Sequence, residues 1–464
     1  MMLGLLTLAL AAEPSWVQVV SLSPTTLPTD ECSTRATIKP PGSPVADTEA
    51  PTTPATPAVD QPKMEPVASA ELSAPYDVST VPIEPLRGRD ADIAAVREVF
   101  MRAAARQQST RVAFYGASHV AGEFFTGQVR RLLQERFGDG GHGLVMPGPP
   151  WKGYRASDVN LCAGGTWYSD HVDRRDGRED GKYGPAGIDV SPADLASFGW
   201  VQTTKSNPQG QRVSRFEVAY LREPGAGKLR LIVDGAAPIE VSAQGPEGPG
   251  MVVLRVHDGP HRLQVMADGP VRVYGTYMER DEPGVVVDAA GVSGRTASSW
   301  LRWDMSLVAP FLARRTPDLV VMAYGTNEAN DRSLTPERYA TDLRAVLARM
   351  RTVAPAAACV LVGPSDRGKL LKKGAYGTWP ATEWVARVQR EVGPEFGCAT
   401  WDLQAAMGGA GSMLRWYFGA SPKLAAGDLI HLSAEGYKEL GTRFVEAITG
   451  QEGGWRGEAG GSER

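Results

Sequence analysis

The sequence predicts an α/β protein whose parallel sheet is covered by helices on both faces and interrupted by an inserted all-β sandwich. Short, continuous apolar runs recur along the chain, and amphipathic helical patterns lie between them. This arrangement is typical of a parallel sheet that is buried on both sides. Between the first two of these runs, a long stretch alternates apolar with polar residues and is rich in turn residues, which indicates antiparallel strands with one buried face.

The first residues of the chain allow two interpretations. Residues 1–13 form an apolar run that ends in small residues, like the hydrophobic part and cleavage site of a secretory signal, but no basic residues precede it. Either the start is misplaced or the segment is not a signal, and it is too short to span a membrane. Residues 14–88 are rich in Pro, Thr, Ala and Ser, so we expect a disordered tether, although a plain unstructured tail fits equally well. Residues 451–464 are expected to form a flexible tail.

The folded part is expected to start with a helix at Asp90–Gln107. Continuous apolar runs predict strands at Val112–Tyr115, Val285–Ala289, Leu319–Ala323, Cys359–Val362 and Ala399–Trp401. Helical periodicity follows at Gly122–Phe137, Thr335–Val353, Thr382–Val392 and Ser433–Ile448. The first two strands lie much further apart than one crossover helix needs, and the segments "SRFEVAYLRE", "GKLRLIVDG" and "VVLRVHDG" between them alternate with period two. We therefore expect a sandwich at 161–283, inserted between two parts of one α/β domain, 89–160 and 284–450.

Charge and cysteine content exclude several classes of function. The 49 Lys and Arg residues nearly balance the 53 Asp and Glu residues, and no basic stripe indicates a nucleic-acid partner. The four cysteines show no close pair with metal-ligand spacing, so neither a zinc site nor a disulfide scaffold is expected. Cys359 and Cys398 are expected to be buried apolar residues, and the residues before Cys32 do not predict lipid modification.

Polar residues gather where the predicted strands end, which is the edge at which ligands bind in parallel sheets. Ser118, in "YGASHV", follows the first strand; the turn is either an ordinary strand-to-helix connection or presents a nucleophile. Gly294, in "GVSGRTASS", and Asn327, in "YGTNEA", offer a backbone and a side-chain donor that could stabilise an oxyanion, although each residue type more often simply forms a turn.

The pair Asp428 and His431 precedes the last predicted helix, whose expected N-cap is Ser433. A carboxylate three residues before an imidazole can accept a hydrogen bond from one ring nitrogen and leave the other to activate a serine. Six histidines and many aspartates make one such pair by chance unremarkable. The order Ser, Gly, Asn and Asp-x-x-His, with each block at its own strand exit or helix entry, is harder to explain by chance.

This order of blocks resembles the SGNH (GDSL-type) hydrolases. The resemblance implies a flavodoxin-like, three-layer α/β/α domain with Ser118 as nucleophile, His431 as general base and Asp428 as its orienting carboxylate. It also implies an oxyanion hole made by the backbone N–H groups of Ser118 and Gly294 and by the Asn327 side chain. The family's first block commonly reads Gly-Asp-Ser, whereas Ala117 precedes the serine here, which puts the geometry of the turn in question.

The continuation "RFGDGGHG", the "YGTNEA" block and the position of the inserted sandwich resemble the peptidoglycan O-acetylesterases of Gram-negative bacteria. That resemblance implies a serine esterase, exported to the periplasm or cell envelope, that removes acetyl groups from a polysaccharide, peptidoglycan above all, and we expect the protein to be a monomer. It requires no metal or organic cofactor, membrane span or nucleic-acid partner. Side chains that could contact substrate, or only pack or carry surface charge, are His119, Trp151, Glu328, Arg295 and Trp379.

Two alternatives use the same residues. The triad could transfer the acetyl group to another sugar hydroxyl, which would make the protein a transferase. Ala117 and the sandwich would also fit a glycan-binding protein without catalysis.

Overall fold

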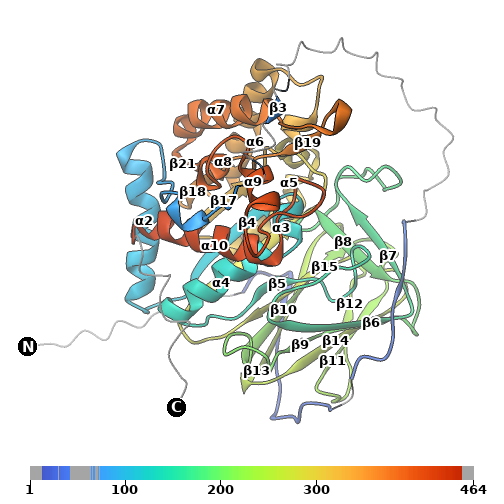
Figure 1. Ribbon diagram of the computed structural model, residues 1–464. Helices are drawn as coiled ribbons and strands as arrows, with labels where there is room; N and C mark the ends of the chain where they lie inside the picture. Colours follow the sequence, from blue (N-terminus) through green and yellow to red (C-terminus); the bar gives the residue numbers. More distant parts are fainter. Residues whose placement is uncertain are drawn as a thin grey trace, which may run out of the picture.

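The computed structural model describes residues 13–29, 31–41, 64, 66–67, 72 and 74–451 (Figure 1). Nearly all of the expected signal at 1–13 and of the expected tail at 451–464 therefore lies outside the described residues, as does a large part of the expected tether.

A parallel sheet of five strands forms the centre of the α/β domain. Its order is β16 (Val285–Gly291), β4 (Thr110–Gly116), β17 (Leu319–Ala323), β18 (Ala358–Val362) and β21 (Cys398–Trp401). All five predicted strands are present, and the first strand of the fold lies between the second and the third. This is the expected α/β/α arrangement with an inserted β domain, and the predicted fold class is confirmed.

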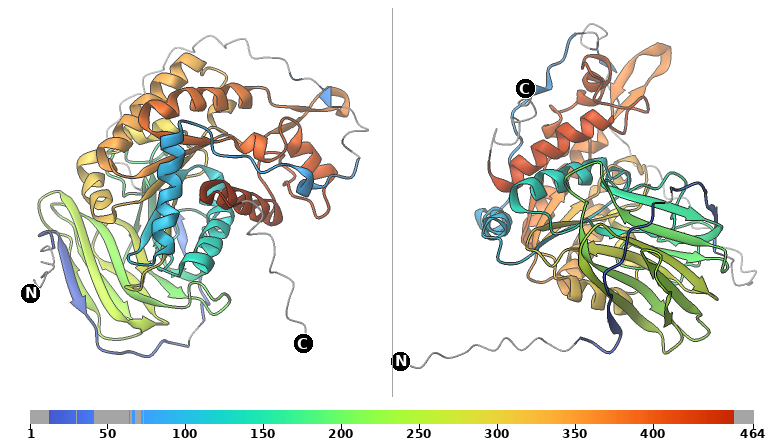
Figure 2. Two further views of the ribbon diagram at one scale, coloured as in Figure 1. Left: turned by 90° about the vertical axis from the view of Figure 1, so that its left-hand side faces the viewer. Right: turned by 90° about the horizontal axis from the view of Figure 1, so that it is seen from below.

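Helices cover both faces of this sheet (Figures 1 and 2). Val112 and Phe114 of β4 belong to the apolar core on one face, and Ala113 and Tyr115 belong to the core on the other. The helices on the first face are α2 (Asp90–Ala104), α4 (Phe124–Phe137) and α10 (Ala434–Thr449). Those on the second face are α5 (Met305–Arg315), α6 (Pro336–Val353) and α7 (Ala381–Val392). The sequence did not predict α5, which contains Pro310, a residue that normally ends a helix.

Two mostly antiparallel sheets form the sandwich. The first contains β1 (Val17–Ser21), β13 (Gly248–Gly259), β10 (Val213–Arg222), β15 (Val273–Glu279), β8 (Ile188–Pro192), β7 (Thr166–His171) and β2 (Thr37–Lys39), and β5 (Gly143–Val145) pairs with β15. The second contains β12 (Ile239–Ser242), β11 (Lys228–Val233), β14 (Arg262–Asp268), β9 (Phe198–Thr203) and β6 (Val159–Gly164). Since β5 and the start of β6 precede residue 161, the sandwich draws on residues before its expected boundary.

Parts of the expected tether are ordered strands. Strand β1 pairs in parallel with β13, and β2 pairs with β7. Strand β3 (Pro66–Val67) joins a small sheet with β19 (Gly368–Leu370) and β20 (Tyr376–Thr378). The expectation of a disordered tether is wrong for these segments. It relied on overall composition, which does not reveal short apolar runs such as "VQVVS" that can pair with a free sheet edge.

All four cysteines are paired, which corrects the expectation of free thiols. Cys32 bonds to Cys162, and Cys359 bonds to Cys398, its direct partner across β18 and β21. Both residues of the second pair are buried, as expected. No local pattern indicated these disulfides, because the bonded cysteines are 130 and 39 residues apart. None of the described helices is both long and apolar enough to cross a bilayer.

A buried cluster of charges joins the sandwich to the α/β domain. Glu279, at the end of β15, is fully buried and pairs with Arg111 of β4, Arg215 of β10 and Arg315 of α5. Burial raises the pKa of Glu279, but Arg315 and Arg111 outweigh it and hold the pKa below its ordinary value. The carboxylate is therefore ionised, and it compensates arginines that come from both domains.

We expect Glu279→Gln to lower the free energy of unfolding by about 3–5 kcal/mol, because it removes the buried carboxylate that Arg111, Arg215 and Arg315 share. Urea unfolding followed by intrinsic fluorescence measures the change. Asp281→Asn is the matched control: Asp281 also pairs with Arg215, but its side chain is 53% exposed. Its loss should cost at most about 1 kcal/mol. Equal unfolding midpoints for the two variants would contradict the role assigned to this cluster.

Candidate active site

Three strands of the parallel sheet end at the same level. Gly116 of β4 pairs with Gly291 of β16 and with Ala323 of β17, so the loops that follow begin at one edge. Glycine is required at this edge because the next helix packs directly on it. A Cβ on Gly116 would lie 2.5 Å from a methyl carbon of Val120, and one on Gly291 would lie 2.2 Å from the backbone nitrogen of Ala121.

Ser118 begins a helix of a single turn, α3 (Ser118–Ala121). The carbonyl of Ala117 accepts hydrogen bonds from the N–H groups of Val120 and Ala121, at 3.1 and 2.9 Å, so backbone bonds form the turn without an acidic side chain at position 117. The chain then breaks at Glu123, whose φ is +62°, before α4 begins. A helix of a single turn has only a small dipole at its N-terminus.

The structure brings Ser118, His431 and Asp428 into one chain of hydrogen bonds. His431 Nε2 lies 2.7 Å from Ser118 Oγ, and His431 Nδ1 lies 2.7 Å from Asp428 Oδ2. Asp428 Oδ1 also accepts from the backbone N–H groups of Ile430 and His431, at 3.0 and 2.9 Å. Burial alone would raise the pKa of Asp428, but these hydrogen bonds lower it below its ordinary value. An ionised Asp428 fixes the proton on Nδ1 and leaves Nε2 free to accept from the serine.

A tight loop holds Asp428 and His431 in place. Leu429 adopts a φ of +57°, and the N–H of Ala426 donates to the carbonyl of His431 at 2.9 Å. Ser433 caps α10 by accepting from the N–H of Gly436, as predicted. The His431 and Asp428 side chains are 36% and 48% exposed, so the site is open to solvent.

The two expected oxyanion donors lie on neighbouring loops that bond to each other. Gly294 follows β16 with a φ of +77°, and a Cβ there would meet open space. Asn327 Nδ2 donates to the carbonyl of Arg295 at 2.8 Å. Because a side-chain amide has two N–H donors, this bond leaves one for an acyl oxygen. The loop that carries Gly294 is thus fixed to the loop that carries Asn327.

Glu328 lies behind these loops and cannot meet a substrate as the sequence suggested. Its side chain is 2% exposed, and its two oxygens accept from the N–H groups of Ala297 and Gly325, at 2.7 and 2.9 Å. Burial raises the pKa of Glu328 to about 7, although the backbone donors act in the opposite direction. Glu328 and Asn327 together cross-link the two loops.

The other suggested contact residues mostly have structural partners. His119 is buried, with Nδ1 2.8 Å from Tyr437 Oη and Nε2 3.2 Å from Ser365 Oγ. Burial, with a smaller contribution from His431, lowers the pKa of His119 to about 3, so the ring is neutral. Trp379 is buried and donates to the carbonyl of Ala329. Trp151 is half-buried and lines a small cavity beside Val120 and Ala121, so it remains a candidate for substrate contact.

A loop of the sandwich supports the Gly294 loop, which no sequence signal indicated. Asp173, between β7 and β8, accepts from Arg295 through its carbonyl at 2.6 Å. Its carboxylate accepts from Ser299 Oγ at 2.8 Å and pairs with Arg302 at 2.8 Å. The inserted domain therefore braces the loop after β16.

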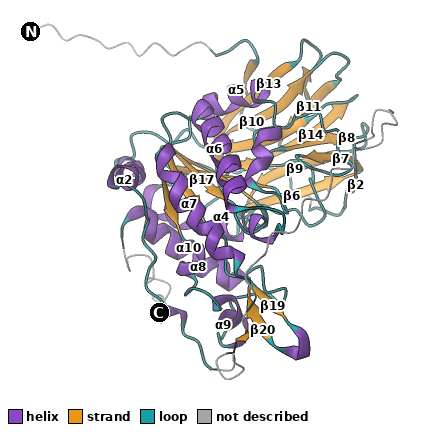
Figure 3. Cartoon of the chain, turned by 90° about the horizontal axis from the view of Figure 1, so that it is seen from above, coloured by secondary structure: helices purple, strands orange, loops and turns teal. Residues whose placement is uncertain are grey.

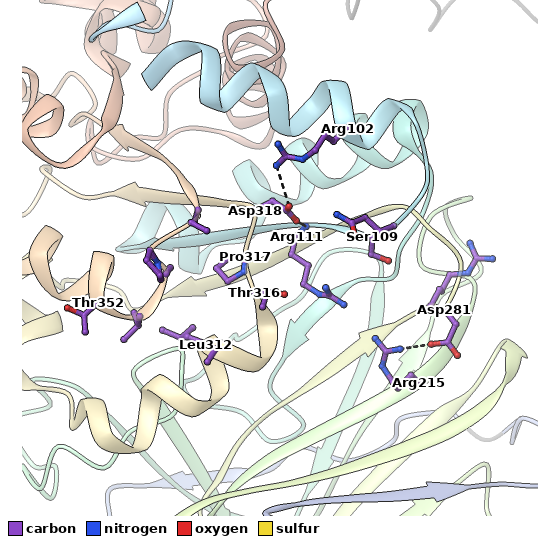
Figure 4. Close-up of a pocket in the computed structure, with 18 residues that line it drawn as sticks. Arg102, Ser109, Arg111, Arg215, Asp281, Leu312, Thr316, Pro317, Asp318 and Thr352 are labelled. Atoms are coloured by element: carbon purple, nitrogen blue, oxygen red, sulfur yellow. Dashed lines mark hydrogen bonds and ion pairs between the residues drawn. The ribbon is translucent and has the colours of Figure 1, made fainter. Parts of the chain in front are cut away.

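A cavity of about 830 Å³ lies at the opposite edge of the sheet, where β4, β17 and β18 begin (Figure 4). Arg111, Thr316, Asp318 and Ala357 line it, and its lining guanidinium groups include Arg102, which pairs with Asp318, and Arg215, which pairs with Asp281. Since Ser118 follows the other end of β4, this cavity is separate from the candidate site. Within the described part of the chain, no three His, Cys, Asp or Glu side chains gather in a way that could hold a metal ion.

Residues 258–439 match the GDSL-like Lipase/Acylhydrolase family. The matched region includes Gly294, Asn327, Asp428 and His431. It begins after Ser118, which the inserted sandwich separates from the other blocks.

Solved structures of esterases resemble the chain. A solved structure of a peptidoglycan O-acetylesterase is 26% identical to this chain, and the match covers 78% of this chain and 97% of the esterase chain, with a TM-score of 0.65. A family two carbohydrate esterase from Clostridium thermocellum, in complex with cellohexaose, is 14% identical and covers 57% of this chain and 95% of its own, with a TM-score of 0.26. An acetyl xylan esterase from Butyrivibrio proteoclasticus is 10% identical and covers 56% and 91%, with a TM-score of 0.23. No curated protein matches the chain.

We expect Glu328→Gln to lower kcat about 10- to 100-fold with little change in KM, because an amide N–H would face one of the two backbone donors and displace an oxyanion loop. Hydrolysis of a small aryl acetate measures both constants. Glu337→Gln, an exposed change on α6, is the control and should leave both unchanged. A rise in the KM of Glu328→Gln with an unchanged kcat would instead indicate loss of ground-state binding.

The raised pKa of Glu328 has a consequence for stability. Between its ordinary value of 4.5 and about 7, the unfolded chain releases this proton more readily than the folded protein. The wild type should therefore lose stability relative to Glu328→Gln as pH rises through this window, by about 3 kcal/mol in total. Urea unfolding of both proteins between pH 4.5 and 7.5 measures the difference. A constant difference would show that Glu328 is ionised throughout.

Proposed function

We propose that the protein is a serine esterase that removes O-acetyl groups from a cell-wall or extracellular polysaccharide, with peptidoglycan as the first candidate. The observation that carries this proposal is the hydrogen-bonded chain from Ser118 through His431 to Asp428 at the shared edge of β4, β16 and β17. Similarity to a peptidoglycan O-acetylesterase, at 26% identity over 78% of the chain, supports the choice of substrate.

In the first half of the reaction, Ser118 Oγ attacks the acetyl carbonyl carbon while His431 Nε2 takes the hydroxyl proton. The carbonyl oxygen becomes an oxyanion that accepts hydrogen bonds from the backbone N–H groups of Ser118 and Gly294 and from the Asn327 amide. As the tetrahedral intermediate collapses, the bond to the sugar oxygen breaks and His431 protonates that oxygen. The products are a deacetylated sugar and an acetyl group esterified to Ser118.

In the second half, a water molecule attacks the acetyl carbonyl and gives its proton to His431 Nε2. The second tetrahedral intermediate uses the same three donors. When it collapses, the bond to Ser118 Oγ breaks, His431 returns its proton to the serine, and acetate leaves. Asp428 stays ionised and holds the ring in the tautomer that both halves require.

The exposure of the site supports hydrolysis over acetyl transfer. With His431 36% exposed, water can reach the acetyl-enzyme, whereas efficient transfer needs water to be excluded. The complete triad geometry disfavours the binding-only alternative, and the backbone bonds of the Ala117 turn replace what an acidic side chain would supply. The two disulfides support an oxidising compartment and hence export. We expect the enzyme to act as a monomer on its glycan.

We expect Ser118→Ala to abolish acetate release, lowering kcat by about 10⁴-fold or more, because no other group can form the acetyl-enzyme. Acetate release is measured from O-acetylated peptidoglycan, acetylated xylan and a small aryl acetate. Ser206→Ala, an exposed serine of the sandwich, is the control and should behave as the wild type.

The substrates separate the alternatives. Serine-dependent release from peptidoglycan but not from xylan would support the proposal, and release mainly from xylan would keep the esterase and reject the cell-wall substrate. Acetylation of an added glycan acceptor in place of acetate release would identify a transferase. A folded wild type that releases no acetate from any of the three, and is not labelled on Ser118 by an alkylphosphonate, would favour the binding-only alternative.

A further inference from the structure

A hairpin formed by β19 and β20 projects from the α/β domain beside the candidate site. Figure 3 shows it next to α9 (Ser412–Phe418), at the end of the molecule away from the sandwich. Residues 372–374 form its tip, and β3 completes its small sheet on the β20 side. We call residues 367–379 the arm.

The arm is strongly basic in a chain whose formal net charge is −4. It carries four cationic residues, Arg367, Lys369, Lys372 and Lys373, and no acidic residue. Lys372 is exposed and Lys369 is half-exposed, and in the described part of the chain neither forms an ion pair with a carboxylate. The nearest preceding acid, Asp366, is buried and accepts from Gln404 and from the N–H of Met413, so it does not offset these charges at the surface.

Apolar side chains lie exposed beside these cations. Leu370 of the arm is 58% exposed, and Phe418 at the end of α9 is 39% exposed. The Phe418 ring lies 4.9 Å from that of Tyr376 and 4.8 Å from that of Tyr417, which forms an aromatic cluster at the surface. Lys423 lies over the Tyr417 ring at 4.0 Å and adds another cation. Aromatic rings with polar neighbours suit the apolar faces of sugars, and cations suit their acidic substituents.

The arm is bonded directly to two loops of the candidate site. The N–H of Gly368 donates to the carbonyl of Leu429, which stands between Asp428 and His431 in the chain, at 2.9 Å. Arg367 donates to Asn330 Oδ1 at 2.8 Å, three residues after Asn327. The arm is therefore fixed to the loop that carries His431 and to the loop that carries Asn327.

We propose that the arm binds carboxylate groups of an anionic polysaccharide strand while an acetylated sugar of the same strand occupies Ser118. Lys369 and Lys372 contact the carboxylates, and Leu370 and Phe418 contact sugar rings. This inference rests on the proposed esterase function and narrows its substrate to acetylated glycans with acidic groups near the ester. Small acetate esters, which cannot reach the arm, do not use it.

The test removes the two charges with Lys369→Gln and Lys372→Gln in one variant. The matched control, Lys205→Gln with Lys228→Gln, removes two exposed lysines from the sandwich. Kinetics with O-acetylated peptidoglycan and with an aryl acetate are measured at two salt concentrations. Binding of all three proteins to insoluble peptidoglycan is measured by co-sedimentation, which does not depend on catalysis.

For the arm variant we expect a KM for peptidoglycan about 3- to 10-fold higher, an unchanged kcat and unchanged aryl acetate hydrolysis. Salt should raise the KM of the wild type and the control, but that of the arm variant much less. Co-sedimentation should weaken in the arm variant alone.

The inference would be overturned if the arm variant and the control bound peptidoglycan equally well and had the same KM. It would also be overturned if the wild type bound anionic phospholipid vesicles more tightly than peptidoglycan, because the arm would then be a membrane contact. If the wild type hydrolyses neither ester, the proposed function fails, and the co-sedimentation comparison still decides whether the arm binds glycan.

Discussion

The parallel pairing of β4 between β16 and β17 is the constraint on which the rest of the structure depends. Its register places Gly116 beside Gly291 and Ala323, so three loops from distant parts of the chain start at one level. The backbones lie too close there for larger residues, and α3 packs directly on the strand ends. Ser118 therefore has little freedom to move relative to the loops that carry the two oxyanion donors.

The site also depends on contacts behind those loops. Two hydrogen bonds accepted by Glu328 and one donated by Asn327 join the loop after β16 to the loop after β17. Asp173 of the sandwich also accepts a hydrogen bond from Arg295 in the loop after β16. Backbone donors that must meet a developing charge are effective only when they are already in position. The buried Glu328 carboxylate holds these loops in position, but burying its charge costs free energy, and its raised pKa reflects this desolvation.

The inserted sandwich is a structural part of the site. Its Asp173 loop contacts the Gly294 loop, and its Glu279 shares buried arginines with the sheet, so its position relative to the α/β domain is fixed. The arm is bonded to a different loop, the one that carries Asp428 and His431.

The sequence by itself determined the strands of the parallel sheet and most of the helices, because each depends on a local pattern, an apolar run or a helical period. Polar residues at strand exits also singled out Ser118, Gly294, Asn327, Asp428 and His431 as candidates for the site. Only the tertiary structure decided that Cys32 is bonded to Cys162 and Cys359 to Cys398, that β1 and β2 extend the sandwich, and that Glu328 faces inward. These features depend on which distant segments meet, and no local spacing records that. For the same reason, the basic residues of the arm gained significance only when the hydrogen bonds from Gly368 to Leu429 and from Arg367 to Asn330 were known.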